Sequence, residues 1–159
     1  MLFFGWTVWT RIVIGANHRG ILARALLVEM LRHRGDDVID CGVFDSVPVD
    51  YPDIAVEVAS KVSLGNAERG ILIGGMGFGM VIAANKFPGV RAVLCHDEVA
   101  AEIGRRHCDC NILCLSSDLT AQEMLRRIVD TWRAAPFEGG RHARRLERIA
   151  RLEDENMKR

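Results

Sequence analysis

The 159-residue sequence has no excess of charge of either sign, because 21 lysines and arginines balance 21 aspartates and glutamates. A chain without net charge lacks the feature that drives non-specific binding to nucleic acids or anionic membranes, so neither is expected as a partner. No signal peptide or membrane span is expected either, since the apolar opening "MLFFGWTVWT" is short and has no basic start. We treat residues 1–10 as an unassigned extension.

A disulfide framework is also missing. The cysteines are odd in number and scattered within apolar stretches, which indicates reduced thiols in a cytoplasmic protein. The chain has no internal repeat, linker or low-complexity segment, and its length fits a single domain at residues 11–159. A domain of this size buries roughly 70% of the surface that its unfolded chain exposes, which is enough for a stable core without disulfide bonds. The cysteines are Cys41, Cys95, Cys108, Cys110 and Cys114.

What the sequence does contain is a regular alternation of strand-like and helix-like segments. Apolar strands separated by helices predict an open α/β/α domain whose five-stranded parallel sheet is covered on both faces. Such sheets bind ligands at the carboxyl ends of their strands, and we assign loops 16–19, 42–51, 74–79, 95–98 and 107–110 to that edge. The expected strands are 11–16, 37–42, 69–74, 90–95 and 111–116. The expected helices are 19–34, 52–64, 78–86, 98–106 and 120–134, with a last helix from about residue 140.

The segment "GILIGGMGFGMVIAANK" (70–86) places four glycines within six residues between a strand and a helix. It matches neither nucleotide motif: Ile82 stands where the dinucleotide fingerprint needs a glycine, and no Gly-Lys-Ser/Thr follows. A tight turn packed on the sheet is one interpretation. The other is a cradle whose backbone N–H groups bind an oxyanion or a phosphate. The loop itself carries no side chain able to perform chemistry.

Several stretches together resemble the ribose-5-phosphate isomerase B family, which includes the two galactose-6-phosphate isomerase subunits. The resemblance implies a three-layer Rossmann-like fold and aldose–ketose isomerisation of a phosphorylated sugar, without a metal or a cofactor. It also implies a homodimer or tetramer whose active sites are shared between subunits. The matching stretches are "IGANHRG" (14–20), "VIDCG" (38–42), "VDYPD" (49–53), "RGILIGGMGFGMVIAANKFPGVRAVLCHDE" (69–98), "RRHCDCNIL" (105–113) and "FEGGRHARR" (137–145).

The resemblance also implies roles for particular residues. His107 matches the histidine that opens the sugar ring. Arg141 and Arg145 match phosphate-binding arginines, and their spacing of four places both on one face of the last helix. Guanidinium groups suit phosphate because they offer two parallel donors. The residues matched to sugar binding are Asn17, His18, Asp50, Tyr51, Gly75, Gly77, Gly79 and Asn111.

The chain departs from the family pattern where the reaction needs a base. Gly74 and Met76 stand where the family usually has Cys, the base that abstracts the proton, and Thr or Ser. A second branch has Glu at the position of Met80. We consider the hypothesis that Cys108, which replaces an Asn after His107, has taken over as base with its pKa lowered by neighbouring cations. The alternative is a small residue that fills space.

Two further departures change the charge of the expected site. Asn17 replaces an Asp, and Asp118 replaces an Arg that contacts phosphate, so that an acid there would repel the phosphate group. These departures leave a second hypothesis open, a non-catalytic sugar-phosphate-binding homologue or the inactive partner of a paralogous subunit. A nucleotide-binding module is disfavoured by the glycine spacing. Metal ligation by "HCDCNILC" is disfavoured as well, because its spacing fits no standard zinc pattern.

Overall fold

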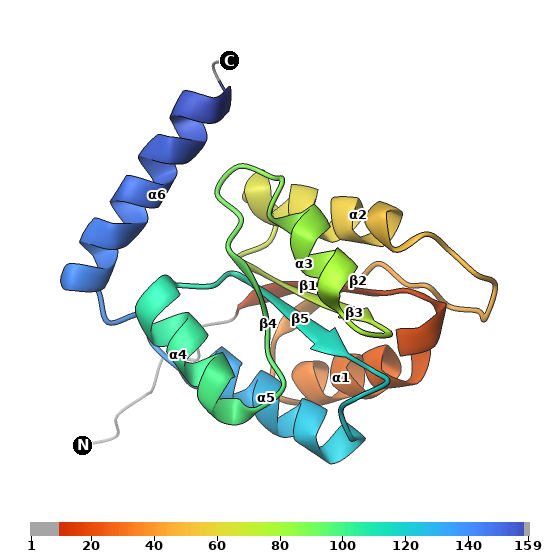
Figure 1. Cartoon of the computed structure of the whole chain (residues 1–159). Coiled ribbons are helices and arrows are strands. Elements are labelled where there is room, and N and C mark those ends of the chain that lie inside the picture. The colour runs from red at the N-terminus through yellow and green to blue at the C-terminus, as the bar shows by residue number, and fades with distance from the viewer. Residues whose placement is uncertain (1–9, 158–159) are drawn as a thin grey trace, which may run out of the picture.

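The computed structural model describes residues 10–157, so nearly all of the expected extension at residues 1–10 lies outside the described residues. Five parallel strands form one sheet in the order β2-β1-β3-β5-β4 (Figure 1). The strands are β1 (Arg11–Ala16), β2 (Asp37–Asp40), β3 (Arg69–Gly74), β4 (Ala92–Leu94) and β5 (Ile112–Ser116). The helices are the 3-10 turn η1 (His18–Gly20), α1 (Ile21–His33), α2 (Tyr51–Ser63), α3 (Phe78–Ala84), α4 (Glu98–Cys108), α5 (Gln122–Ala134) and α6 (Arg141–Met157).

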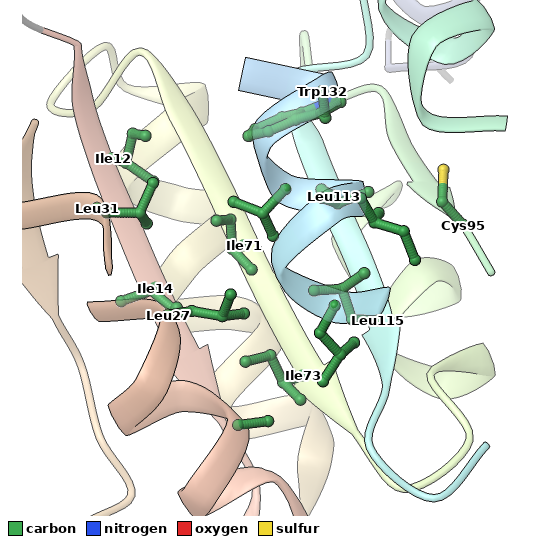
Figure 2. Close-up of a cluster of buried hydrophobic side chains, with 14 of the residues drawn as sticks. Ile12, Ile14, Leu27, Leu31, Ile71, Ile73, Cys95, Leu113, Leu115 and Trp132 are labelled. Carbon is green, nitrogen blue, oxygen red and sulfur yellow. The ribbon is translucent and has the colours of Figure 1, made fainter. Parts of the chain in front are cut away.

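The three inner strands β1, β3 and β5 are apolar along most of their length because both faces of the sheet are covered. Alternate residues of β3 point in opposite directions: Ile71 and Ile73 pack against α1 and α5, whereas Leu72 packs against α2 and α3. Figure 2 shows the first of these two clusters, with Ile71 and Trp132 among its buried side chains. The predicted three-layer Rossmann-like α/β fold with a five-stranded parallel sheet is therefore confirmed.

The expected segments are close to the observed ones, and the differences have local causes. The helix expected from residue 19 begins as η1, because the Asn17 side-chain oxygen accepts a hydrogen bond from the Arg19 N–H at 3.1 Å. The helix expected at 98–106 continues to Cys108 and ends where Asp109 adopts a left-handed conformation, with φ of 45°.

The assignment of loop 107–110 to the carboxyl edge of the sheet is wrong. These residues end α4 and lead into β5, so they precede a strand instead of following one. In the parallel register, Gly70 pairs with Ile112 and Gly74 pairs with Ser116. Loop 107–110 therefore lies at the amino edge of the sheet, opposite the glycine loop that follows Gly74.

Helix α6 stands away from the layered body (Figure 1). His142 is its one buried residue among those described, and the Glu153 carboxylate accepts a hydrogen bond from the Gly89 N–H at 2.8 Å. Ile149 and Leu152 on this helix are 55% and 58% exposed. The helix thus keeps an apolar stripe that residues 10–157 leave exposed. Among residues 10–157, no helix is both long and apolar enough to cross a membrane.

Candidate active site

A cleft of about 480 Å³ opens at the carboxyl edge of the sheet, and the glycine loop forms its floor. Within residues 10–157, the backbone N–H groups of residues 75–80 donate no hydrogen bond to the chain. The loop carbonyls are occupied instead: Gly74 O accepts from the Ser117 N–H, and Gly75 O accepts from the Asp118 N–H and the Ser116 hydroxyl. The loop therefore has its acceptors satisfied and its donors available. The cleft is lined by Asn17, Arg19, Tyr51, Gly74, Gly75, Met76, Gly77, Phe78, Gly79, Met80 and Asp118.

Packing also explains two of the glycines. Gly77 has a φ of 83°, and a Cβ there would lie 2.6 Å from Leu94 Cδ1. At Gly79, a Cβ would lie 2.4 Å from the ring of Tyr51, so that the glycine lets the ring lie against the loop. The tight-turn interpretation is thus correct for these positions, and the available N–H groups come in addition to it.

Three of the loops expected at the carboxyl edge meet at this cleft. The Asn17 N–H donates to Ile73 O at 3.1 Å, and the Val43 N–H donates to Ala16 O at 3.0 Å. His18 Nδ1 accepts from the Val49 N–H at 3.4 Å, which draws loop 42–51 toward the end of β1. The predicted residues Asn17, His18, Asp50, Tyr51, Gly75, Gly77 and Gly79 all belong to these three loops or begin the helices that follow them.

The place where a side chain at Gly74 would lie is occupied by a thioether. Met80 is 1% exposed, and its Cγ lies 3.3 Å from the position that a Cβ on Gly74 would take. A methionine has no proton to exchange near neutral pH. The floor of the cleft therefore offers donors and apolar surface, with no base of its own.

Sequence reasoning missed Arg19. Its Nη2 lies 2.8 Å and its Nε 3.0 Å from Asp118 Oδ2, so two guanidinium nitrogens contact the carboxylate at the wall of the cleft. Arg19 therefore compensates the negative charge of Asp118, and the expected repulsion of a phosphate stays a prediction. Arg19 follows His18 in "NHRG", at the carboxyl end of β1, and this position was the signal available in the sequence.

A second group of polar side chains lies at the amino edge of the sheet. The rings of His107 and His142 are stacked, with centroids 4.2 Å apart and planes inclined by 9°. Glu138 Oε2 lies 3.7 Å from His107 Nε2 and 3.5 Å from His142 Nε2. The other Glu138 oxygen accepts a hydrogen bond from Arg106 Nε at 2.7 Å. Glu138 and His142 were also missed, although both belong to the matched stretch "FEGGRHARR".

Neighbouring side chains determine the charge states of Glu138 and His142. Hydrogen bonding to Arg106 lowers the pKa of Glu138, so this carboxylate is anionic at neutral pH. Burial, followed by the charges of His107 and Arg141, lowers the pKa of His142. His142 is therefore a neutral ring at pH 7, and it can accept the hydrogen bond that Arg141 Nε donates to its Nε2 at 3.4 Å.

His107, Glu138 and His142 lie close enough together to suggest a metal site, but their orientation does not suit one. An imidazole donates its lone pair in the plane of the ring, and two nearly parallel stacked rings cannot both aim at one ion. The cysteines nearby are poor ligands as well. Burial raises the pKa of the Cys110 thiol to about 12, so it stays protonated.

The remaining predicted residues lie at this amino edge too. Cys108 is exposed at the end of α4, while Arg141 and Arg145 are exposed on α6. Asn111 is already engaged: its Oδ1 accepts from the Arg91 N–H at 2.7 Å, and its Nδ2 donates to Gly89 O at 2.9 Å. Each of these atoms has capacity for a second hydrogen bond, and the assigned binding role of Asn111 stays a prediction.

The predicted site residues thus form two groups at opposite edges of one sheet. The cleft with its free N–H groups lies at the carboxyl edge, whereas His107, Cys108, Arg141 and Arg145 lie at the amino edge. A parallel sheet keeps these edges apart by the length of its strands, about 3.3 Å for each residue. One chain by itself does not bring the two groups together.

The fold and the glycine cleft agree with a family comparison. A model of the family described as Ribose/Galactose Isomerase matches residues 12–149, and the chain belongs to this family. It is 43% identical over 143 residues to ribose-5-phosphate isomerase B of Escherichia coli (strain K12), covering 90% of this chain and 96% of that protein.

Solved structures give the same result. A ribose-5-phosphate isomerase B from Clostridium thermocellum superposes with a TM-score of 0.90 at 42% identity, covering 92% of this chain and 99% of the other. The Mycoplasma genitalium ribose-5-phosphate isomerase B, solved with bound ribulose-5-phosphate, gives a TM-score of 0.88 at 40% identity. In that pair the match covers 91% of this chain and 97% of the other.

Proposed function

We propose that this chain isomerises a phosphorylated sugar between its aldose and ketose forms, with ribose 5-phosphate and ribulose 5-phosphate as the first pair to test. The observation that carries the proposal is the set of available N–H groups at residues 75–80 in the cleft, in a chain that belongs to the Ribose/Galactose Isomerase family. The related Mycoplasma genitalium enzyme was solved with bound ribulose-5-phosphate.

The reaction moves a proton between adjacent carbons through an enediolate, which carries negative charge on oxygen. Backbone N–H groups aimed at such an oxyanion stabilise the transition state without any reorganisation. His107, beside Glu138, acts as the acid and base that opens the sugar ring, and Arg141 and Arg145 bind the phosphate. The reaction has no net oxidation, so it needs no redox cofactor, and we propose that it proceeds without a metal.

The active site forms between two copies of the chain, as a homodimer or within a tetramer. Because they lie at the amino edge, His107, Arg141 and Arg145 reach a glycine cleft only if that cleft belongs to another subunit. Uncovered apolar side chains support the contact. Phe78 and Ile82 on α3, beside the cleft, are 55% and 64% exposed. We place the protein in the cytoplasm because all five cysteines are free thiols.

A non-catalytic homologue or an inactive partner of a paralogous subunit is the second candidate. The observation that favours it is the floor of the cleft, where Gly74 and the buried Met80 offer no base. In that case the cleft would bind a phosphorylated sugar and leave its C–H bonds intact.

One experiment separates the two candidates. The purified protein alone is incubated with ribose 5-phosphate in ²H₂O, followed by tetrose and hexose phosphates, while deuterium at C2 is followed by NMR. Exchange with at least one of them is expected, and unphosphorylated ribose is the matched control, because Arg141 and Arg145 then have nothing to anchor. Binding without exchange would favour the non-catalytic homologue, and neither binding nor exchange would reject both.

A further inference from the structure

We propose that Asp118 is the base that abstracts the proton from C2, and that Arg19 holds its carboxylate in place and stabilises the enediolate that forms. This inference rests on the proposed function, because it assigns the reactive group that such an isomerase requires. Nothing in the sequence pattern suggested it, since Asp118 was expected to weaken phosphate binding.

The choice follows from what lines the cleft. A base for this step must be unprotonated at neutral pH and must reach a carbon whose oxygen rests on the loop. Among the described residues that line the cleft, the titratable side chains are Arg19, Tyr51 and Asp118. An arginine and a tyrosine are protonated at neutral pH, which leaves the carboxylate.

Asp118 is held against the glycine loop by the backbone as well. Its own N–H donates to Gly75 O at 3.1 Å, and the Ser116 hydroxyl donates to the same carbonyl at 2.6 Å. Asp118 Oδ2 lies 2.9 Å from the point where a Cβ on Gly75 would be. The carboxylate therefore occupies the place of a loop side chain and faces whatever the loop N–H groups bind.

The pairing with Arg19 is uneven between the two carboxylate oxygens. Oδ2 accepts from both Nε and Nη2, at 3.0 and 2.8 Å, whereas Oδ1 accepts only the longer hydrogen bond of 3.2 Å from Nε. The side chain of Asp118 is 29% exposed and lines the cleft, and Oδ1 is the less engaged of its two oxygens. Arg19 acts here as a positioning residue for Asp118 and as a cation beside the reacting oxygens.

The step conserves protons and electrons. The C2–H bond of the open-chain aldose breaks, and its proton passes to the Asp118 carboxylate. The C–H electron pair forms the C1–C2 double bond, and the carbonyl electrons pass to O1, giving an enediolate. The hydroxyl proton then moves from O2 to O1, and Asp118, whose bound proton exchanges with solvent, delivers a proton to C1 as O2 becomes the ketone oxygen.

Arg19 makes this transfer electrostatically feasible. As Asp118 takes up the proton it loses its negative charge, and the same charge appears on the enediolate a few ångströms away. The guanidinium lies beside both groups, so its positive charge faces the carboxylate before the transfer and the enediolate after it. Cys108 lies beside His107 at the opposite edge and would act on the cleft of another subunit, whereas Asp118 lines the cleft of its own chain.

The test measures exchange and binding separately. Asp118→Asn is expected to slow deuterium exchange at C2 by ~10²- to 10⁴-fold, the usual contribution of a general base. The Kd of ribose 5-phosphate, measured by calorimetry, is expected to stay within about tenfold, because the residue acts on the transition state. Glu123→Gln, which neutralises an exposed carboxylate on α5, is the matched control and should leave both values unchanged.

The role of Arg19 is tested by comparing the effect of its substitution on kcat with the effect on KM. Arg19→Met is expected to lower kcat by about 10- to 100-fold with a smaller rise in KM, since the charge it faces develops in the transition state. If Arg19 had a purely structural role, Arg19→Met would lower the thermal stability and leave the relative effects on kcat and KM unchanged. Arg126→Met, on the exposed side of α5, is the matched control.

A rescue keeps the proposal falsifiable if a single variant is hard to interpret. Gly74→Cys in the Asp118→Asn background supplies a thiol on the loop, and its Cβ would lie 3.3 Å from Met80 Cγ, so the Met80 side chain must shift by a few tenths of an ångström. Exchange should recover at least about tenfold, because a thiolate can serve as the base. Gly74→Ser in the same background cannot form a thiolate and should recover nothing.

The outcomes separate the two claims. Wild-type exchange rates in Asp118→Asn would overturn the assigned base and leave the isomerase intact. Absence of exchange in the wild-type protein with every sugar phosphate would overturn the proposed function and the base together. Loss of exchange in Asp118→Asn with binding retained, followed by rescue through Gly74→Cys, would support both.

Discussion

The two edges of the sheet carry different kinds of chemistry. At the carboxyl edge, the cleft is built largely from backbone: within residues 10–157 the N–H groups of residues 75–80 have no partner, and the ion pair of Arg19 with Asp118 lies at the wall. At the amino edge, the site is built from side chains, with His107 stacked on His142 and Glu138 shared between them and Arg106. One edge can stabilise an anion, and the other can supply protons and cations.

The difference explains why neither edge suffices for an isomerase. An enediolate held by N–H groups still needs its ring opened and its phosphate anchored, and the groups suited to those tasks lie across the sheet. Two chains related by a twofold axis would pair each edge with its complement twice, which gives two identical sites. Three further experiments test this comparison.

The largest effect on turnover is expected from a pair of variants, each of which damages the site residues at one edge of the sheet. Gly75→Val fills the floor of the cleft, since its Cβ would meet the ends of Arg19 and Asp118, while His107→Asn removes the ring-opening group. Each variant alone should lose ~10²- to 10⁴-fold in turnover. Refolded together in equal amounts, they should recover about a quarter of the wild-type activity, because half of the twofold dimers then hold one intact site.

The same-edge mixture is the control for that experiment. His107→Asn refolded with Arg145→Ala damages only amino-edge groups, so every site keeps a defect and no recovery is expected. Recovery there, or none with Gly75→Val, would contradict a site shared between the two edges.

A smaller effect is expected at the phosphate anchor. Arg141→Ala or Arg145→Ala should raise KM for the phosphorylated sugar by about 10- to 100-fold, the range for losing a hydrogen bond between two charged groups. Arg148→Ala, exposed on the same helix, should change KM little. Steady-state kinetics would refute the assignment if all three variants behaved alike.

The smallest effect is expected in the dependence of thermal stability on pH. Because burial and neighbouring cations lower the pKa of His142 below its ordinary 6.5, the unfolded chain takes up this proton first as the pH falls. The contribution of His142 to stability is therefore complete above about pH 6.5 and is lost below it, through the lowered pKa of the folded chain. Thermal denaturation should show a midpoint that falls between pH 7 and pH 5, and a His142→Asn variant should show a weaker dependence.

Much of the fold followed from the sequence because its signals are local. The runs at 11–16 and 69–74 are β-strands with the expected bounds, since fully apolar strands between helices specify a sheet covered on both faces. Asn17 and Asp109 moved helix ends by a residue or two through contacts and conformations that depend on the surrounding chain.

The site was predicted less completely. The glycine loop and His107 stood out by composition and by resemblance, but Arg19, Glu138 and His142 did not. Their importance comes from contacts across long sequence separations, such as Arg19 with Asp118 and His107 with His142. Loop 107–110 was assigned to the wrong edge, because its position depends on whether the loop leads into a strand or away from one.

The sequence by itself determined the layered α/β architecture, the cradle of glycines and the absence of a usual base on it, because each is written in residue type and spacing. Only the tertiary structure decided that Asp118 is paired with Arg19 and displayed beside Gly75, and that Met80 fills the space above Gly74. It also decided that the predicted site is divided between two edges. The physical reason is that charge compensation and strand direction act between residues far apart in the chain, and folding alone brings those residues into contact.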